Sequence, residues 1–464
     1  MLKFLKHYFP IRNIIFFLLE GFVIFGSVLL ATVILTFSPS YWFDMMLVLR
    51  VLLITFICQI SLYYNDLYDF DVASNIPEIS IRLLQALGVT SIALAFIYFF
   101  FPLAIINWKI YILSIGFVLV FIIGWRIAYL KMLNRGIFNE KIILLGSSNF
   151  AFEIYNTIIH TIDCGYTVAM IIPDSDDNDL YEKIPDSSII QKVNKDLLTV
   201  CREHEIEKIV VALKEKRGNF PMDELLQCRT AGIEVIDGSS FYEMLTGKVM
   251  VRRINPSWLI FSDGFKKSKI RNFIKRIEDI VMSSVMLILL SPLLIIVSIL
   301  IKLTSKGPVL FSQDRVGKDR KEYMMHKFRS MVADAEKLTG PVWAQDNDDR
   351  ITRVGRVIRK YRIDELPQLW EVLTGKMSMV GPRPERRHFT DKLEAEIPFY
   401  GQRFHVKPGL TGWAQVCYDY GATIEDAVEK LNYDLFYIKN MSLTMDFIII
   451  LKTIKTVLFG RGAR

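Results

Sequence analysis

The chain has 464 residues, of which 52% are hydrophobic and 12% aromatic, and its formal net charge is +7. The apolar content exceeds that of a typical soluble protein, which argues against an ordinary soluble enzyme and indicates membrane integration. The positive charge suits an anionic partner, either lipid head groups or phosphorylated substrates. The five cysteines are scattered without metal or redox spacing, so we expect reduced thiols in a protein that faces the cytosol.

Four apolar runs fill the N-terminal part of the chain, and each is near the roughly 20 residues that a membrane-spanning helix needs. They are Ile14–Phe37, Met45–Tyr64, Leu83–Ile106 and Ile110–Leu130. Lysines and arginines precede the first run and follow the fourth, whereas the first short connection has none. Both ends of this region are therefore predicted to lie in the cytoplasm. No small-residue cleavage site follows the first run, so we expect an uncleaved anchor.

Two arginines interrupt the apolar runs. Arg50 and Arg126 lie near the ends of their runs. We expect both side chains to reach the membrane interface, and the alternative is that they are functional charges buried in the membrane.

From Lys141 the pattern changes to that of a soluble domain. Strand-like runs alternate with helical segments, which is typical of a small doubly wound domain with a parallel sheet. The strand-like runs are Ile142–Leu145, Tyr166–Ile172, Lys208–Leu213 and Ile233–Ile236. A dinucleotide-binding turn would carry several glycines after the first strand, but Gly146 is followed by Ser148 and Ala151 at the positions where further glycines would sit. We therefore predict a Rossmann-like domain without an intact nucleotide site.

Residues 280–301 form an uncharged apolar run that is long enough to cross a bilayer as a straight helix. Ser291-Pro292 lies in its middle, where the proline removes a backbone donor and must kink or break the helix. Cations flank the run on both sides, and such residues normally stay in the cytoplasm. They are Arg271, Lys275 and Arg276 before the run and Lys302 and Lys306 after it. We therefore predict a re-entrant helix that dips into the membrane and returns, and the alternative is a proline-kinked spanning helix.

The segment after this run is dense in lysine and arginine around the acidic pair Asp364-Glu365. Arginine binds phosphate oxygens with a two-pronged fork and lysine acts as a point charge, so such cations suit a diphosphate held over a carboxylate. Each feature also has a simpler explanation. The acids could cap a helix that contains Pro367, the arginines could form a solvated or lipid-facing surface, and Gly381–Glu385 could be a rigid turn.

Five features occur together and in order in the C-terminal part of the chain. They are the broken helix at Ser291-Pro292, Lys327–Met331 (KFRSM), Asp364–Leu369 (DELPQL), Gly381–Glu385 (GPRPE) and Lys407–Trp413 (KPGLTGW). From about Arg271 to Arg464 the chain thereby resembles the bacterial sugar transferase family, the polyprenyl-phosphate glycosyl-1-phosphate transferases or monotopic phosphoglycosyl transferases. With the predicted spans and the α/β domain in front, it resembles the long, WbaP-like members, which initiate exopolysaccharide or O-antigen assembly.

The resemblance implies a transfer of sugar-1-phosphate from a UDP-sugar to undecaprenyl phosphate, which gives undecaprenyl-diphosphate-sugar and UMP through a covalent phosphosugar on Asp364. Glu365 would help bind Mg²⁺ or accept a proton, so both acids are candidate metal ligands. By motif match, Arg315, Lys327, Arg329, Arg359 and Arg383 are candidate phosphate contacts and Asp434 is a further polar site residue. We expect Asp364 to be ionised, since it lies at a helix start beside arginines.

The predicted architecture has three parts: four transmembrane helices in residues 1–138, a Rossmann-like α/β domain in residues 139–262, and an α-rich catalytic domain in residues 263–464 with the re-entrant helix at 280–301. The resemblance places the catalytic domain on the cytoplasmic face of the bacterial inner membrane. The expected partners are UDP-sugar, undecaprenyl phosphate and membrane lipid; a homodimer is left open, and no nucleic acid is expected. The final stretch, Asp446–Phe459, is amphipathic and is predicted to lie at the membrane interface, with a core helix as the alternative.

Two other functions compete with this interpretation. A membrane-anchored NAD-dependent nucleotide-sugar dehydratase or epimerase would need a glycine-rich turn and a Tyr-x-x-x-Lys pair in the middle domain. The glycines are missing, and the spacing from Tyr323 to Lys327 lies outside that domain. A non-catalytic scaffold of a polysaccharide complex is the other alternative, and the acidic pair with its surrounding cations argues against it.

Overall fold

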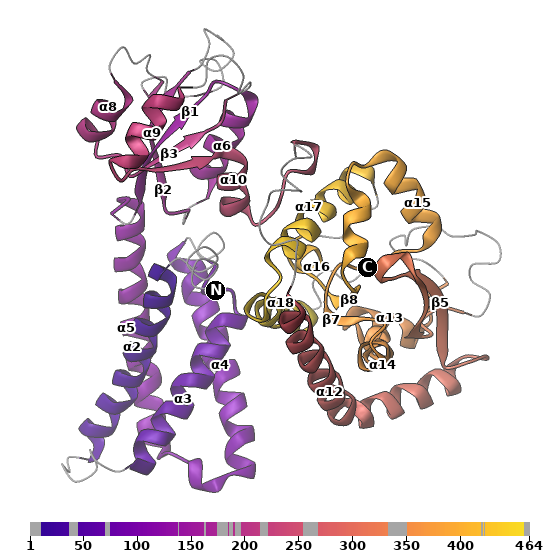
Figure 1. The fold of residues 1–464 in the computed structure, drawn as a ribbon. Coiled ribbons are helices and arrows are strands. Elements are labelled where there is room, and N and C mark those ends of the chain that lie inside the picture. The colour runs from indigo at the N-terminus through magenta and orange to yellow at the C-terminus, as the bar shows by residue number, and fades with distance from the viewer. Residues whose placement is uncertain are drawn as a thin grey trace. The chain divides into compact units, whose positions relative to one another are not determined.

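The structure is a computed structural model (Figure 1) that describes residues 11–36, 45–69, 75–137, 139–161, 164–173, 184, 189–190, 196–213, 221–253, 268–332, 350–418, 421 and 423–458. By internal contacts the chain divides into two units, Met1–Thr246 and Gly247–Arg464. The predicted domain boundary at residue 262 lies outside the described residues, so the three-part division stays a prediction.

The described part of the first unit begins with four long apolar helices. They are α2 (Ile11–Thr36), α3 (Met45–Tyr64), α4 (Ile76–Phe100) and α5 (Trp108–Asn134). All four are long and apolar enough to cross a membrane, as predicted. α4 begins at Ile76 and not at Leu83, because Pro77 is tolerated in a first helical turn, where an N–H would have no partner within the helix. It ends just before the short helix η2 (Pro102–Ala104).

An ion pair is buried between α2 and α5. The Arg126 guanidinium lies 2.7 Å from Glu20 Oε1, and the two side chains are only 3% and 0% exposed. Arg126 also donates a hydrogen bond to the carbonyl of Leu67. The prediction that Arg126 reaches the interface is therefore wrong, because an acid and a carbonyl from neighbouring segments satisfy its charge inside the protein. Arg50, in contrast, is half-buried near the start of α3 and bonds a carbonyl of η2.

The second half of this unit contains one parallel sheet, as predicted. Its strands lie in the order β2-β1-β3-β4. They are β1 (Glu140–Leu145), β2 (Tyr166–Ile172), β3 (Lys208–Val211) and β4 (Glu234–Asp237), and the helices between and after them are α6 (Asn149–His160), α8 (Leu197–Glu203), α9 (Met222–Thr230) and α10 (Gly238–Thr246). The strand runs had been recognisable because parallel strands are buried on both faces and form short, nearly continuous apolar segments.

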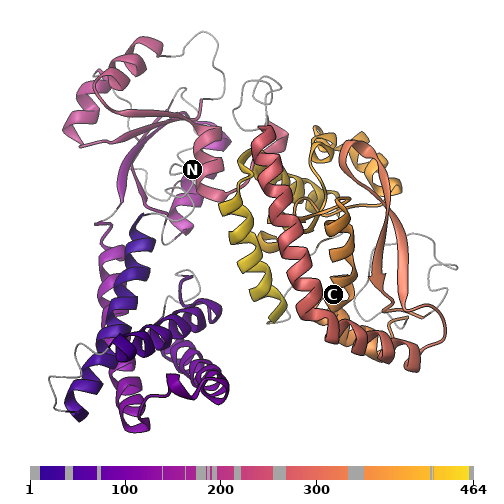
Figure 2. The same cartoon turned by 60° about the horizontal axis from the view of Figure 1, so that its bottom comes forward.

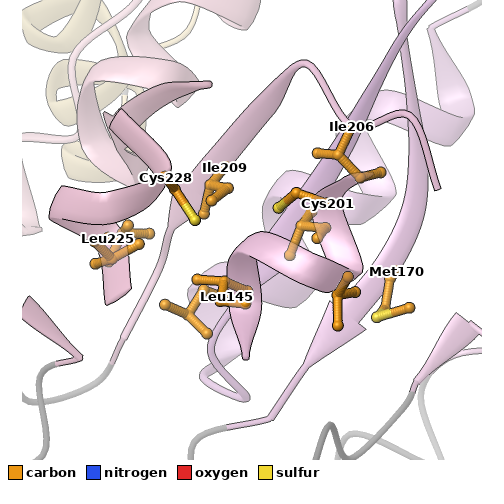
Figure 3. Close-up of a cluster of buried hydrophobic side chains, with 11 residues drawn as sticks. Leu145, Met170, Cys201, Ile206, Ile209, Leu225 and Cys228 are labelled. Atoms are coloured by element: carbon orange, nitrogen blue, oxygen red, sulfur yellow. The ribbon is translucent and has the colours of Figure 1, made fainter. Parts of the chain in front are cut away.

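One face of the sheet packs against α8 and α9 (Figure 3). Leu145 and Ile209 from the strands lie beside Cys201 and Cys228 from the two helices, and all four are buried. Burial, with the neighbouring thiol adding to it, raises the pKa of Cys201 to about 12. A thiol that stays protonated in apolar surroundings is inert, so these cysteines serve packing, as their scattered spacing predicted.

The turn after β1 is shaped by close packing of the backbone. Gly146 has φ +131°, and a Cβ at this position would lie 2.5 Å from the carbonyl oxygen of Ala212. Ser148 accepts a hydrogen bond from the N–H of Ala151 and donates one to the same carbonyl of Ala212. The close approach of this turn to the end of β3 therefore explains why a glycine stands at position 146, without any bound nucleotide.

The second unit combines short helices with two small sheets. Its elements are η4 (Val251–Arg253), α12 (Lys269–Thr304), β5 (Leu310–Val316), η5 (Lys318–Arg320), β6 (Glu322–Phe328), α13 (Arg353–Lys360), η6 (Ile363–Gln368), α14 (Leu369–Thr374), β7 (Ser378–Val380), α15 (Arg387–Glu396), η7 (Tyr400–His405), β8 (Gly409–Thr411), α16 (Trp413–Cys417), α17 (Ile424–Asn440) and α18 (Leu443–Leu458). β5 and β6 form an antiparallel hairpin, and β7 pairs with β8 in parallel.

α12 is a single helix of 36 residues with Pro292 inside it, and its ribbon turns sharply part-way along (Figures 1 and 2). Near its start, Arg276 donates to two carbonyls at the end of α14, each at 2.7 Å. Near its other end, Val297 and Ile301 pack into one apolar cluster with residues of β6 and α13. Both limbs of the bent helix therefore contact the same globular unit.

α18 lies alongside the first limb of α12 (Figures 1 and 2). Asp446 is buried and accepts hydrogen bonds from Lys275 of α12 at 2.6 Å and from Tyr437 of α17 at 2.8 Å. On the other side of α18, Phe447 is 60% exposed. The core-helix alternative therefore holds for the inner face of α18. The interfacial position stays a prediction, and Phe459 lies outside the described residues.

Candidate active site

The acidic pair lies on η6, which packs across β6. Arg362, the residue before η6, has φ +51° and ψ +23°, a left-handed conformation that residues other than glycine rarely adopt. This turn brings the chain out of α13 and points the next residues toward β6. Asp364 and Glu365 fall in the first turn of η6, as the capping alternative supposed, although neither is its N-cap residue.

Glu365 is buried among three cations. Its Oε1 accepts hydrogen bonds from Lys327 Nζ at 2.9 Å and from the Arg383 guanidinium at 2.8 Å, while a nitrogen of Arg362 lies 3.6 Å from Oε2. Burial alone would raise the pKa of Glu365, but attraction to these cations outweighs burial and holds the pKa well below its usual range. Glu365 is therefore ionised and fixes the positions of the cations around it.

Asp364 has a different environment. No described residue donates a hydrogen bond to its carboxylate. Burial and the charge of Glu365 raise its pKa to about 6, against the attraction of Lys327, Arg359 and Arg383. The carboxylate is thus ionised at neutral pH, although its pKa is shifted upward and not downward as arginine neighbours alone would suggest. An ionised carboxylate without hydrogen-bond donors suits a nucleophile.

Three predicted site residues have their hydrogen bonds elsewhere. Arg329 is buried and donates to the backbone oxygen and the hydroxyl of Ser305, where α12 ends. Arg315 donates to the carbonyl of Pro384 at 3.3 Å. Asp434 is buried on α17 and accepts from a guanidinium at 2.8 Å. The fold therefore groups the acidic pair with Lys327, Arg359 and Arg383, and it places Arg315, Arg329 and Asp434 around this group.

Known proteins match this second unit. The family model described as "Bacterial sugar transferase" matches residues 270–460. The exopolysaccharide production protein PSS of Rhizobium leguminosarum is 43% identical over 195 residues, which are 41% of this chain and 98% of that protein. The chain belongs to the bacterial sugar transferase family.

Two longer relatives carry more specific names. The UDP-N-acetylgalactosamine-undecaprenyl-phosphate N-acetylgalactosaminephosphotransferase of Aeromonas hydrophila is 47% identical over 240 residues, 52% of this chain and 56% of that protein. The UDP-glucose:undecaprenyl-phosphate glucose-1-phosphate transferase of Klebsiella pneumoniae is 43% identical over 182 residues, 39% of either chain. The chain thus matches about half or less of the length of these two proteins. The bacterial sugar transferase match contains the whole candidate site and all of the bent α12 except its first residue.

Two arginines that contact candidate site residues were not predicted as site residues from the sequence. Arg362 contacts Glu365. It could have been predicted from the sequence, because it belongs to a basic run and lies three residues before that acid. Arg403, the guanidinium that binds Asp434, also donates to the carbonyl of Arg383. No sequence motif marks it, because it is brought to the turn around Arg383 only by the fold.

The carboxylates of the site can be compared with the ligands that the predicted magnesium ion needs. No cluster of three or more His, Cys, Asp or Glu side chains suited to a metal occurs among the described residues. Oε1 of Glu365 already accepts from two cations, whereas the carboxylate of Asp364 has no donor among the described residues. Mg²⁺ in phosphate-transfer sites commonly binds one or two carboxylates and completes its shell with substrate phosphates and water. The residues fit a magnesium ion that binds Asp364 together with a diphosphate.

Proposed function

We propose that this sugar transferase moves a sugar-1-phosphate from a UDP-sugar to undecaprenyl phosphate and releases UMP. The observation that carries the proposal is the pairing of two unlike carboxylates. Asp364 has no hydrogen-bond donor among the described residues, whereas Glu365 binds Lys327 and Arg383. The names of the Aeromonas and Klebsiella relatives support the same donor and acceptor classes. Since the match spans only part of those proteins, the activity of the whole chain is part of the proposal.

In the first step, a carboxylate oxygen of Asp364 attacks the β-phosphorus of the UDP-sugar. The bond from this phosphorus to the bridging oxygen breaks, and UMP leaves with that oxygen and its electron pair. The phosphosugar remains on Asp364 as an acyl phosphate. Lys327 and Arg383, which Glu365 holds in place, present positive charge to the phosphate oxygens during the attack.

In the second step, a phosphate oxygen of the lipid acceptor attacks the same phosphorus. The bond between phosphorus and Asp364 breaks and restores the free carboxylate, and the product is a lipid diphosphate that carries the sugar. If the acceptor enters as a dianion, the two steps together need no proton from the protein. This agrees with a site whose second acid, Glu365, is held ionised by cations.

We also propose that α12 enters and leaves the membrane on the same side, the cytoplasmic face of the bacterial inner membrane. A straight helix of 36 residues would be about 54 Å long, more than the roughly 30 Å of a bilayer core. The contacts of both limbs with one globular unit favour a bent path that returns. A lipid acceptor would then reach the site from the leaflet that α12 enters.

Magnesium and a homodimer remain predictions. When bound, Mg²⁺ would neutralise charge on the substrate phosphates. Asp364 is its best supported ligand, and a second bond from Glu365 stays a prediction. The division into residues 1–138, 139–262 and 263–464 is retained as a prediction as well. No observation favours the dehydratase or the scaffold over the transferase.

The full-length protein in detergent or membranes is expected to release UMP when it is given undecaprenyl phosphate with either UDP-glucose or UDP-N-acetylgalactosamine. Removal of Mg²⁺ with a chelator should reduce the rate strongly, and added Mg²⁺ should restore it. Coupled detection of UMP and chromatography of the lipid product measure the two halves of the reaction. No UMP with either donor, or a dehydrated or epimerised nucleotide sugar, would contradict the proposal.

The rate of UMP release is expected to fall as the pH drops through about 6. The pKa of Asp364 is raised to about 6, so lowering the pH through that value protonates the attacking carboxylate, whereas Glu365, with its lowered pKa, stays ionised. Initial rates between about pH 5 and about pH 8 measure this acid limb. A rate that is the same at pH 7 and pH 5 would refute a role for the ionised Asp364.

A further inference from the structure

The turn that carries Arg383 is held only in part through its own N–H groups. Pro382 and Pro384 flank Arg383, and proline has no backbone donor. Gly381 donates its N–H to the carbonyl of Thr411, and the carbonyl of Pro382 accepts from the N–H of Gly409, each at 2.9 Å. The next three carbonyls of the turn also accept hydrogen bonds from other elements. The carbonyl of Arg383 accepts from Arg403 at 3.1 Å, that of Pro384 from Arg315 at 3.3 Å, and that of Glu385 from the N–H of Val316 at 3.0 Å.

Arg403 is the most strongly fixed of these donors. It is buried, and besides the carbonyl of Arg383 it binds the carboxylate of Asp434 at 2.8 Å and the hydroxyl of Tyr400. Its guanidinium also lies 5.0 Å from the centre of the Tyr400 ring. A planar guanidinium donates in several fixed directions at once, which a lysine ammonium on a flexible stem cannot reproduce. Arg403 therefore connects α17 and η7 to the turn that carries Arg383.

Arg315 makes a parallel set of contacts from β5. Besides the carbonyl of Pro384, it binds the side chain of Gln313 at 2.7 Å and lies 3.6 Å from the carboxylate of Glu385. Its guanidinium is thus directed toward the turn and its own strand. That Arg315 also contacts a substrate phosphate stays a prediction.

We propose that Arg403, anchored by Asp434, is a positioning residue that holds Arg383 against Glu365. The inference rests on the proposed phosphosugar transfer. A chain of direct contacts carries it: Asp434 to Arg403, Arg403 to the backbone of Arg383, and the side chain of Arg383 to Glu365. A shift of about 1 Å in a phosphate-binding arginine is enough to lower a rate by roughly 100-fold.

The test replaces Arg403 by lysine in the full chain, which keeps the positive charge but loses the fork. We expect kcat/KM for UMP release to fall by roughly 10- to 100-fold. Thermal unfolding of the purified variant shows whether it is folded. Asp434→Asn is the second variant, since it releases the anchor without altering the arginine, and the same direction of change is expected.

A split between kcat and KM separates positioning from simple loss of structure. The side chain of Arg383 donates to Glu365 at 2.8 Å and is a candidate contact of the substrate phosphates. If Arg383 moves away, KM for the UDP-sugar should rise several-fold. A smaller amount of correctly folded enzyme would lower the apparent kcat and leave KM unaltered.

The matched control is Arg320→Lys. Arg320 also binds a carboxylate, that of Glu394, and also lies over an aromatic ring, that of Phe404 of η7. No hydrogen bond joins it to the turn around Arg383 among the described residues. Its lysine variant is expected to keep kcat/KM within about twofold of the unaltered protein and to leave KM for the UDP-sugar unaltered.

The outcomes are distinct. A lowered kcat/KM with a raised KM for the UDP-sugar in Arg403→Lys or Asp434→Asn, but not in Arg320→Lys, supports the inference. An unaltered kcat/KM, or a lowered kcat with an unaltered KM, overturns it while the proposed function stands. If the unaltered chain releases no UMP from UDP-glucose or UDP-N-acetylgalactosamine, the proposed function fails and the inference fails with it.

Discussion

Asp364→Asn is expected to abolish UMP release, with a loss of at least about 10⁴-fold and no loss of folded protein. Asparagine has the same shape as aspartate but cannot form the acyl phosphate. The substitution removes no structural hydrogen bond, because no described residue donates one to Asp364. It also relieves the repulsion from Glu365. The measurement is UMP release with intact membranes, beside thermal unfolding of the purified protein.

The matched control is Asp314→Asn, which changes an exposed acid on β5 and is expected to leave the rate unaltered. A second measurement uses a UDP-sugar labelled in the sugar and omits the lipid acceptor. The unaltered protein and Asp314→Asn should retain covalently bound label, and Asp364→Asn should retain none. Turnover or bound label in Asp364→Asn would show that another residue is the nucleophile.

Cysteines placed on the two sides of α12 are expected to react with a membrane-impermeant maleimide from the cytoplasmic side only. Suitable positions are Lys269 and Lys306, which are both exposed. The background is a chain in which the half-buried Cys164 and Cys417 are replaced by serine, since the other three cysteines are buried. Labelling is compared between inside-out vesicles and intact cells. If α12 is re-entrant, both cysteines are labelled in inside-out vesicles and neither is labelled in intact cells.

The control for sidedness is a cysteine at Leu103, which is 75% exposed in the connection between α4 and α5. The charge pattern of the apolar runs predicts this connection to lie outside, so it should be labelled in intact cells. If the cysteine at 306 behaves like that at 103, and the one at 269 does not, α12 spans the membrane. In that case the proline kinks the helix without returning it.

The strands of the α/β domain could be predicted from the sequence because burial on both faces leaves an apolar signal that does not depend on any partner. The predicted run Tyr166–Ile172 is the observed β2, residue for residue. The grouping of Lys327, Arg383 and the acidic pair was also predicted, but by motif resemblance, since no periodicity relates segments this far apart. Local signals and motifs were therefore sufficient for the elements and for the centre of the site.

The remaining contacts of the site and of the membrane helices depend on which elements pack together, and this cannot be predicted from a single sequence. Arg126 appeared to be a snorkelling cation because its acid, Glu20, lies on another helix. Arg315 and Arg403 could not be assigned to the turn around Arg383, because their acceptors are backbone carbonyls, which every residue has. The upward shift in the pKa of Asp364 was missed for a similar reason, since burial, its largest cause, is known only once η6 has packed on β6.

The ion pair between Glu20 and Arg126 has a consequence for biosynthesis. α2 is synthesised before α5, so Glu20 lacks its partner Arg126 until α5 has been made. An unpaired acid inside a spanning helix costs up to about 2.5–3.5 kcal/mol on translocon scales. α2 therefore gains its full stability in the lipid only after α5 has arrived.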